Sequence, residues 1–162
     1  MLVHLSELVA RWKKDPRGTA LQLTLPVLLL ERLGDGAEAS WERTGAFFVG
    51  KQPEAHDPPV FFVEKVPRTG NAFALGVTIG RVESNDIIID DSSISRFHAW
   101  LQLDAKKGWM LCDAESKNGT QLDGEPLTSG AKVPLRDGAV IGLGHAALRF
   151  LLPQTLVELL KA

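Results

Sequence analysis

The chain has 162 residues, of which 44% are hydrophobic and 23% are charged, and its formal net charge at pH 7 is −2. This length suits one domain with extensions rather than two full domains, and the hydrophobic content is sufficient for a packed core. The small negative charge argues against a nucleic-acid-binding surface, which would require an excess of basic residues.

Cysteine usage and the apolar pattern predict a cytoplasmic protein. Cys112 is the only cysteine in the sequence, so no intramolecular disulfide can form, which favours a reducing compartment. The N-terminus lacks a basic segment followed by an apolar one, so no secretory signal peptide is expected. The longest apolar run, near residues 25–30, is far shorter than the roughly 18–20 residues that span a bilayer.

Residues 1–58 are expected to form an N-terminal extension that is mainly helical. Apolar residues recur at helical spacing in residues 1–14: Leu2, Leu5, Val9 and Trp12. Asp15 to Gly18 has the composition of a turn. A second helix is predicted from about Pro26 to Leu33, with proline at its first position, although the alternation in residues 21–25 favours a strand there. Residues 46–49 are expected to form a short strand or a buried turn, and the prolines of residues 52–59 indicate a linker.

Two roles are open for this extension. It can cover an edge or a face of the following domain, or it can be a docking element for another protein. Trp12 and Trp41 fit either role, because aromatic side chains serve protein cores and interfaces alike.

From Val60 onward the pattern changes to that of short strands separated by turns, which predicts a β-sandwich over residues 59–153. Lys106-Lys107-Gly108, Asp123-Gly124 and Asp137-Gly138 are predicted turns. The expected strands are residues 60–66, 72–79, 87–89, 98–103, 108–113, 120–122, 131–134, 139–142 and 146–152. Residues 154–162 are predicted to form a short C-terminal helix, because Leu156, Val157, Leu159 and Leu160 share one side of it.

Three short polar groups fall in loop-prone segments between these predicted strands: Gly80-Arg81, Ser95-Arg96-Phe97-His98 and Ser116-Lys117-Asn118-Gly119-Thr120. Strands that return to one edge of a sheet bring their loops together, and binding groups collect on such loops. Arginine offers a planar fork of donors, and serine and asparagine add neutral donors. This set of groups suits a tetrahedral dianion such as phosphate.

The order and spacing of these groups resembles the forkhead-associated (FHA) domain family. Its pattern is a strand that ends in Gly-Arg, then Ser-x-x-His about fifteen residues later, then Asn-Gly after about twenty more; here these are Gly80-Arg81, Ser95 to His98 and Asn118-Gly119. The resemblance covers roughly residues 60–152. It implies an all-β FHA-type sandwich of two twisted, mostly antiparallel sheets that binds phosphothreonine in partner proteins.

The resemblance also implies roles for individual residues. Arg81 and the hydroxyl of Ser95 are expected to contact the phosphate, and Arg96 is expected to add a second charge-assisted contact. Lys117 is expected to supply a point charge, and Asn118 to hold the backbone of the bound peptide. The alternative is that these are an ordinary strand-end arginine, a turn serine and a plain Asn-Gly turn.

Gly80, His98 and Gly119 are expected to support the site without touching the ligand. Gly80 permits a close backbone approach that a side chain would block, and in the resembled family the histidine hydrogen-bonds the loop backbone. Asn85 and Asp86 follow Arg81 in a loop that, in similar proteins, reads the residue three positions after the phosphothreonine.

Enzymatic activity and metal binding are not expected. Ser95 and His98 could suggest a nucleophile and its base, but the sequence contains no Gly-x-Ser-x-Gly elbow. It also contains no phosphate-binding loop of nucleotide hydrolases. The four histidines show no metal-ligand spacing, and Asp90-Asp91 lacks the rest of a calcium loop. No cofactor is therefore expected.

The sequence thus predicts a phosphothreonine-dependent protein-binding module that acts as a signalling adaptor. Its expected partners are phosphothreonine-containing proteins, with a Ser/Thr protein kinase acting upstream, and neither nucleic acid nor a membrane. The alternative is a phospho-independent protein-interaction scaffold on the same fold.

Overall fold

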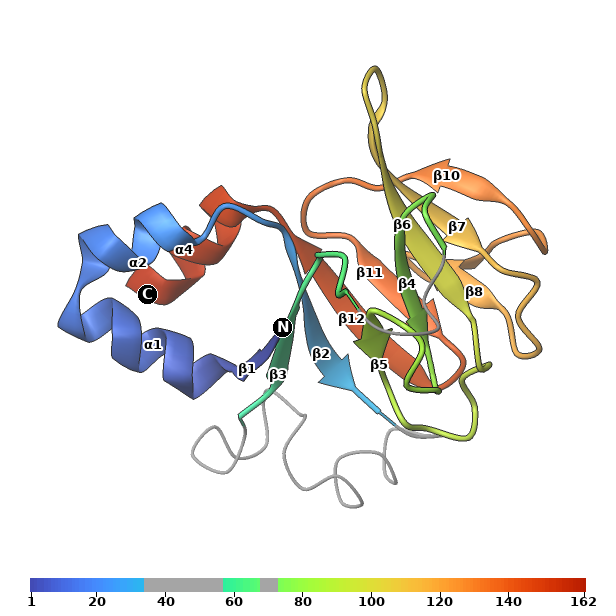
Figure 1. The fold of residues 1–162 in the computed structure, drawn as a ribbon, viewed down its shortest axis with the longest axis horizontal. Coiled ribbons are helices and arrows are strands. Elements are labelled where there is room, and N and C mark those ends of the chain that lie inside the picture. Colours follow the sequence, from blue (N-terminus) through green and yellow to red (C-terminus); the bar gives the residue numbers. More distant parts are fainter. Residues whose placement is uncertain (34–56, 68–72) are drawn as a thin grey trace.

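The computed structural model describes residues 1–33, 57–67 and 73–162, and these residues form two β-sheets with helices on one side (Figure 1). The larger sheet has seven strands in the order β1-β3-β2-β12-β11-β8-β9, and the smaller sheet has five in the order β10-β7-β6-β4-β5. Every described strand pair is antiparallel except β4 with β5. The expected all-β sandwich of two mostly antiparallel sheets is confirmed.

The strands of the larger sheet are β1 (Leu2–His4), β2 (Val27–Arg32), β3 (Pro59–Phe62), β8 (Thr120–Leu122), β9 (Glu125–Pro126), β11 (Val140–Leu143) and β12 (Ala146–Leu151). The strands of the smaller sheet are β4 (Val77–Gly80), β5 (Ile87–Ile88), β6 (Ala99–Asp104), β7 (Gly108–Asp113) and β10 (Lys132–Pro134). The helices are α1 (Leu5–Lys14), α2 (Pro16–Gln22) and α4 (Pro153–Lys161). The predicted short C-terminal helix is present. The helix predicted over residues 1–14 begins only at Leu5, because Leu2–His4 form β1 and pair with β3.

Two apolar clusters hold the layers together. The first combines side chains of both sheets, including Leu101 and Leu111 of the smaller sheet and Ile141 and Leu148 of the larger one. The second joins the outer face of the larger sheet to the helices, through residues such as Leu156 of α4. Burial of apolar surface on both faces makes the larger sheet the middle layer of the molecule.

Strand β2 corrects the prediction of a helix over residues 26–33. Leu28 and Leu30 belong to the cluster between the sheets, whereas Val27 and Leu29 belong to the cluster under the helices. Because both faces of the strand are buried, its sequence is a continuous apolar run without the alternation of a half-exposed strand. Such a run cannot be distinguished from a buried helix by its periodicity.

The position of β2 also changes the role of the N-terminal region. The strand lies between β3 and β12, where Leu28 pairs with Phe61 and with Phe150. Residues 27–32 are therefore an inner strand of the larger sheet. The N-terminal region expected to end at residue 58 thus contributes a strand to the sandwich itself.

Helix α2 begins where the sequence predicted a turn. Asp15 caps this helix by accepting a hydrogen bond at Oδ1 from the Gly18 amide (3.0 Å), and Pro16 occupies the first turn. An Asp-Pro pair is a good helix start because the side chain satisfies a free amide and proline fixes a helical φ angle.

Several predicted elements differ from the structure in length or lie outside the described residues. The strand predicted over residues 60–66 is Pro59–Phe62, and the strand predicted over residues 72–79 is Val77–Gly80. The predicted strand at residues 46–49, the turn at residues 68–71 and most of the predicted linker lie outside the described residues. Within the described ranges, no helix is long and apolar enough to cross a bilayer.

Candidate functional site

The three sequence motifs meet at one end of the sandwich. The loop after β4, the loop between β5 and β6, and the loop between β7 and β8 are joined by hydrogen bonds. The Arg81 amide donates to the Ser95 carbonyl (3.0 Å), and the Lys117 amide donates to Ser95 Oγ (3.0 Å). Asn118 Nδ2 donates to the Ser93 carbonyl (2.8 Å). The loop between β5 and β6 is therefore the centre of the arrangement.

Arg81 is partly buried and oriented by this central loop. Its Nε donates to the carbonyl oxygen of Ile94 (3.0 Å), in addition to the backbone bond with Ser95. Within the described part of the chain, neither terminal nitrogen of the guanidinium has an acceptor. The side chain is thus held at one nitrogen and presents the other two to a ligand, which suits recognition of two oxygens of one anion.

Ser95 presents a hydroxyl whose acceptor side is already occupied. Oγ accepts the hydrogen bond from the Lys117 amide, so the hydroxyl proton is directed elsewhere. Arg96 and Lys117 are both exposed. The joined loops therefore carry one hydroxyl donor and three cationic residues, Arg81, Arg96 and Lys117.

His98 is buried, with a side-chain exposure of 0%, and connects two of the loops. Its Nδ1 accepts a hydrogen bond from the Ser95 amide (3.0 Å), and its Nε2 lies 2.9 Å from the Gly119 carbonyl oxygen. This pairing defines a neutral imidazole that carries its proton on Nε2. Burial lowers the pKa of His98, although the Gly119 hydrogen bond and the Asp113 charge act in the opposite direction.

The same geometry argues against a catalytic pair. Both ring nitrogens of His98 are engaged by backbone groups, so neither is available to the Ser95 hydroxyl. A serine nucleophile needs a base within hydrogen-bond reach of its oxygen.

Asp113, at the end of β7, organises the loop that carries Lys117 and Asn118. Its Oδ1 accepts from the hydroxyls of Ser116 (2.6 Å) and Thr120 (2.7 Å), and its Oδ2 accepts from the Gly130 amide (3.1 Å). Burial raises the pKa of Asp113, but these hydrogen bonds together lower it by more, so the pKa lies below its usual value. A single aspartate at a strand end carries no distinctive pattern, so the sequence alone does not indicate this role.

A fourth loop, between β11 and β12, also reaches this end of the sandwich. The His145 amide donates to Ser93 Oγ (2.9 Å), and the Gly144 amide donates to the Gly119 carbonyl (3.3 Å). A Cβ atom on Gly144 would lie 2.4 Å from the Ser93 carbonyl oxygen, so this contact requires glycine. The exposed His145 side chain is a further group on this loop, and no sequence motif indicates it.

The two glycines expected to support the site do so through backbone contacts. A Cβ on Gly80 would lie 2.1 Å from the Arg96 carbonyl oxygen, so the close approach that glycine permits is to the central loop itself. Gly119 has a φ of +82°, which disfavours other residues, and its carbonyl receives the His98 bond.

Asn85 and Asp86, in the loop that reads a flanking peptide residue in similar proteins, are both buried. Asn85 is 3% exposed and donates to the carbonyls of Val82 (2.9 Å) and Arg96 (2.6 Å). Asp86 is buried and accepts hydrogen bonds from Thr78 and from Lys65 Nζ (2.8 Å). Both side chains therefore hold the loops in place.

The described residues contain no cluster of three or more histidine, cysteine, aspartate or glutamate side chains that could hold a metal ion.

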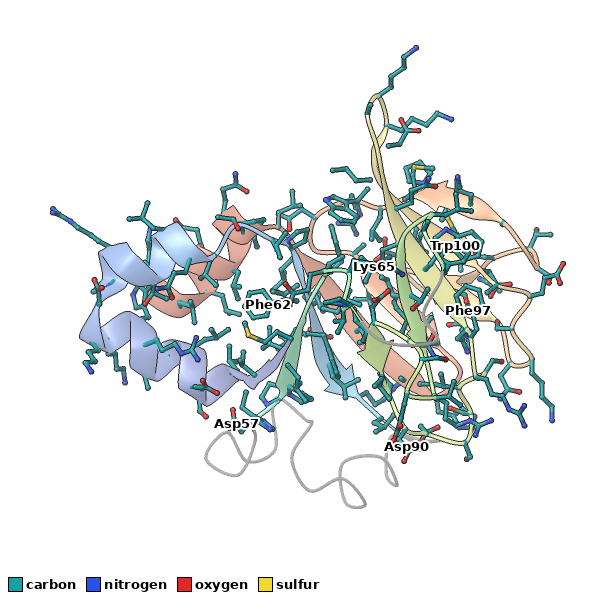
Figure 2. All side chains as sticks on the ribbon, in the orientation of Figure 1. Asp57, Phe62, Lys65, Asp90, Phe97 and Trp100 are labelled. Carbon is teal, nitrogen blue, oxygen red and sulfur yellow. The ribbon has the colours of Figure 1, made fainter. Side chains whose placement is uncertain are left out.

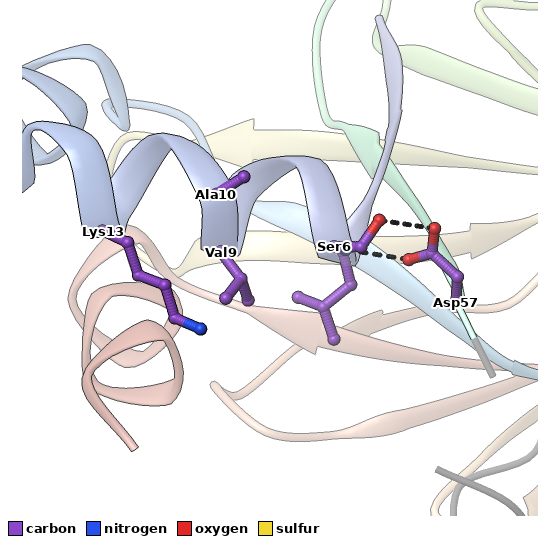
Figure 3. A pocket seen from close by; sticks show the side chains of 6 residues that line it. Ser6, Val9, Ala10, Lys13 and Asp57 are labelled. Carbon is purple, nitrogen blue, oxygen red and sulfur yellow. Dashed lines mark hydrogen bonds between the residues drawn. The ribbon is translucent and has the colours of Figure 1, made fainter. Parts of the chain in front are cut away.

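A separate shallow groove of about 430 Å³ lies on α1 (Figure 3), lined by Leu5, Ser6, Val9, Ala10, Lys13 and Asp57. Asp57 closes one end of this groove by capping α1, since its carboxylate accepts from the Ser6 amide (2.8 Å) and hydroxyl (2.6 Å).

The fold and site together define a class of protein: a β-sandwich module that presents cationic and hydroxyl donors from clustered loops to an anionic partner group. Comparison with known proteins gives the family. The family model for the FHA domain matches residues 77–144. The glycogen accumulation regulator GarA of Mycobacterium tuberculosis is 30% identical over 125 residues, which cover 75% of this chain and 73% of GarA.

Two further similarities concern smaller regions or the fold. An FHA domain-containing protein of Arabidopsis thaliana is 41% identical over 86 residues, but the chain spans only 22% of that protein's length. The FHA domain of a Chlamydia trachomatis protein superposes with a TM-score of 0.49 at 20% identity, covering 77% of this chain and 96% of that one.

This chain belongs to the FHA domain family. The family identity inferred from the motif spacing is thereby confirmed. FHA domains are phosphopeptide-recognition modules, so the functional class expected from the sequence is confirmed at the level of the family.

Proposed function

We propose that this chain binds phosphothreonine-containing segments of other proteins and acts as a signalling adaptor downstream of a Ser/Thr protein kinase. The proposal is supported by the hydrogen bonds that join the loops carrying Arg81, Ser95, Arg96 and Lys117 at one end of the sandwich. A phosphate at pH 7 carries a charge of about −1.5 to −2 and three acceptor oxygens. The two terminal nitrogens of Arg81 and the Ser95 hydroxyl supply donors for these oxygens.

Each residue has a separate role in this proposal. Arg81 forms a forked contact with the phosphate, and Ser95 donates its hydroxyl proton to it. Arg96 and Lys117 are exposed cations that add electrostatic attraction. One Nδ2 hydrogen bond to the Ser93 carbonyl holds the Asn118 side chain in place, and its amide group contacts the peptide backbone.

The proposed module has no enzymatic activity and works in the cytoplasm without a cofactor, on protein partners rather than nucleic acid or membranes. The engagement of both His98 nitrogens by backbone groups supports the absence of a serine nucleophile. We assign the binding function to residues 59–153, with β2 completing the larger sheet and residues 154–162 packing on it through α4. A fluorophosphonate probe that labelled Ser95 would contradict this assignment.

The test is calorimetric titration of a phosphothreonine peptide selected from an oriented phosphopeptide library. Arg81→Ala should weaken binding by about 2–5 kcal/mol, because it removes one partner of a desolvated charge pair. Ser95→Ala should cost about 2 kcal/mol, since its contact is neutral. Arg136 is the matched control, because it is 69% exposed and lies in the loop between β10 and β11, at the opposite end of the sandwich. Unchanged affinity in both site variants would refute the proposed binding mode.

The α1 groove favours one alternative, a phospho-independent scaffold that uses the N-terminal region for protein contacts. The groove is apolar along Leu5 and Val9 and carries one cation, Lys13. Ala10→Glu would place a carboxylate on this exposed surface. Loss of partner binding in Ala10→Glu, together with full binding in Arg81→Ala, would support the scaffold and exclude phosphate-dependent recognition.

A further inference from the structure

Ser93 joins three of the loops at the site, although it belongs to none of the three sequence motifs. The residue is buried, with 6% of its surface exposed. Its hydroxyl donates to Asp91 Oδ1 (2.5 Å) and accepts from the His145 amide (2.9 Å), so it connects the central loop to the loop between β11 and β12. The Ser93 carbonyl accepts from Asn118 Nδ2 (2.8 Å), which belongs to the loop between β7 and β8.

These bonds fix Ser93 and leave its hydroxyl without a role as a ligand contact. Asp91 Oδ1 also accepts from the Ser93 amide (2.9 Å), two residues along the chain, which is the bond of an Asx turn. The single hydroxyl proton is used by Asp91, and the His145 amide occupies the acceptor side. A buried side chain engaged in this way can act on a bound ligand only through another residue.

The turn at Gly144 and His145 holds Asn118 from two sides. The His145 amide binds the Ser93 hydroxyl, and the Gly144 amide donates to the carbonyl of Gly119, the residue that follows Asn118 (3.3 Å). A Cβ atom on Gly144 would lie 2.7 Å from Ser93 Oγ, so the turn and Ser93 are in direct contact. The acceptor of the Asn118 side chain and the backbone beside Asn118 are therefore both attached to this turn.

The Asn118 side chain depends on Ser93 for its orientation. A primary amide has two N–H donors and one carbonyl oxygen. Within the described residues, this amide makes a single hydrogen bond, the one to the Ser93 carbonyl. The terminal torsion of asparagine has broad energy wells, so rotamer preference alone does not fix the amide plane. The direction of the remaining N–H and the oxygen therefore follows from the position of the Ser93 carbonyl.

We propose that Ser93 is a positioning residue for peptide binding: its hydroxyl holds the carbonyl that directs the Asn118 amide to the peptide backbone. This inference rests on the proposed function, because it requires a bound peptide for Asn118 to contact. Ser93→Ala keeps the carbonyl but deprives the His145 amide of its acceptor, which frees the carbonyl and the Asn118 amide to move. Hydrogen bonds weaken steeply when their angle falls below about 120°, so a misdirected amide binds the peptide less well.

The test is a double-mutant cycle measured by calorimetric titration with one phosphothreonine peptide. Ser93→Ala should weaken binding about three- to tenfold, which is equivalent to one neutral hydrogen bond. In the Asn118→Ala background the same change should alter affinity by less than about twofold, because the residue through which Ser93 acts is absent. A general weakening of the fold would instead reduce affinity in both backgrounds.

The free chain gives a second readout that a merely structural role would not change. The Asn118 side-chain NH₂ signals in a ¹H–¹⁵N NMR spectrum, identified by their loss in Asn118→Ala, should shift in Ser93→Ala because their acceptor moves. Asp91→Ala removes the other partner of the Ser93 hydroxyl and should give the same pattern in both measurements. This variant carries the test if Ser93→Ala does not fold.

Ser6→Ala is the matched control, because it removes another serine hydroxyl that donates to a carboxylate, that of Asp57 (2.6 Å). Ser6 lies on α1, and Figure 2 shows Asp57 apart from Asp90 and Phe97, which belong to the central loop. This variant should leave peptide affinity and the Asn118 signals unchanged.

The outcomes separate the inference from the proposed function. If the wild-type chain binds the peptide, unchanged affinity in Ser93→Ala would overturn the inference and leave the proposed function intact. Equal losses in the two backgrounds, or Asn118 signals that keep their positions in Ser93→Ala, would have the same meaning. A wild-type chain that does not bind the peptide would refute the proposed function itself, and the inference with it.

Discussion

Replacing His98 with alanine tests whether this residue builds the site or contacts the ligand. The imidazole joins the central loop to the loop between β7 and β8 through the Ser95 amide and the Gly119 carbonyl. The side chain is fully buried, so no water can replace these bonds without entering the core. We therefore expect the variant to lose stability first, and peptide affinity as a consequence.

The size of the effect follows from the partners that are left behind. The Ser95 amide loses its acceptor, and an unsatisfied buried group costs about 1–3 kcal/mol. Gly119 is less affected, because its carbonyl also accepts from the Gly144 amide (3.3 Å). Removing the ring leaves a cavity that adds about 1 kcal/mol or more. The sum is about 2–4 kcal/mol, which lowers the melting temperature by roughly 4–16 °C for a chain of this size.

The assay is thermal melting beside calorimetric titration with a phosphothreonine peptide. His145→Ala is the matched control, since this histidine is exposed on the neighbouring loop and its side chain should change stability by less than about 0.5 kcal/mol. If His98→Ala lost affinity with an unshifted melting temperature, the reasoning would be refuted and His98 would belong among the ligand contacts.

Three further predictions concern the supporting residues. Burial lowers the pKa of His98, so below its ordinary value of 6.5 the unfolded chain binds more protons than the folded one. The free energy of unfolding should therefore fall from pH 7 to pH 5, and it should fall less steeply in His98→Ala. Chemical denaturation at each pH measures both slopes. Asp113→Ala should lower the free energy of unfolding by about 2–4 kcal/mol at pH 7, because the buried carboxylate accepts hydrogen bonds from two hydroxyls and an amide. The variant should also bind the peptide more weakly, because the loop that carries Lys117 and Asn118 loses this support. A lower melting temperature with full peptide affinity would contradict the predicted effect on binding. Gly80→Ala should destabilise the fold by about 1–3 kcal/mol, because the new methyl meets the Arg96 carbonyl, and an unchanged melting temperature would show that this contact is not tight.

Motif spacing predicted the family and the loops that meet better than apolar patterning predicted the N-terminal fold. The Gly80-Arg81, Ser95-to-His98 and Asn118-Gly119 groups identified the family and the loops that meet, because a binding site needs particular residue types at particular strand ends. Strand β2 was missed because its two faces are both buried, which removes the alternation on which strand prediction depends.

The roles of polar residues within the loops depended on burial, which the sequence does not reveal. Asn85 and Asp86 have the composition of an exposed reading loop, yet both side chains point inward to backbone and side-chain partners. Asp113 and Ser93 hold the site together through contacts that span the chain, such as the bond between Ser93 and the His145 amide. Contacts of this kind follow from the completed fold and have no local sequence signal.

The measurement that tests the central claim most directly is a titration with four peptides that differ at one residue: phosphothreonine, phosphoserine, glutamate and unmodified threonine. A carboxylate offers one charge and two oxygens, so the donors of Arg81 and Ser95 would be incompletely paired around glutamate. In the FHA family the threonine methyl is buried beside the position of Asn118, and one buried methyl is worth about 0.8 kcal/mol, or roughly a fourfold preference over phosphoserine.

We expect phosphothreonine to bind best, phosphoserine at least several-fold more weakly, and glutamate and threonine not measurably. Phosphothreonine affinity should also fall below about pH 6, where the phosphate regains its second proton. Equal affinity for phosphothreonine, phosphoserine and glutamate would show that the site reads generic negative charge, and would contradict the assignment of this chain as a phosphothreonine reader.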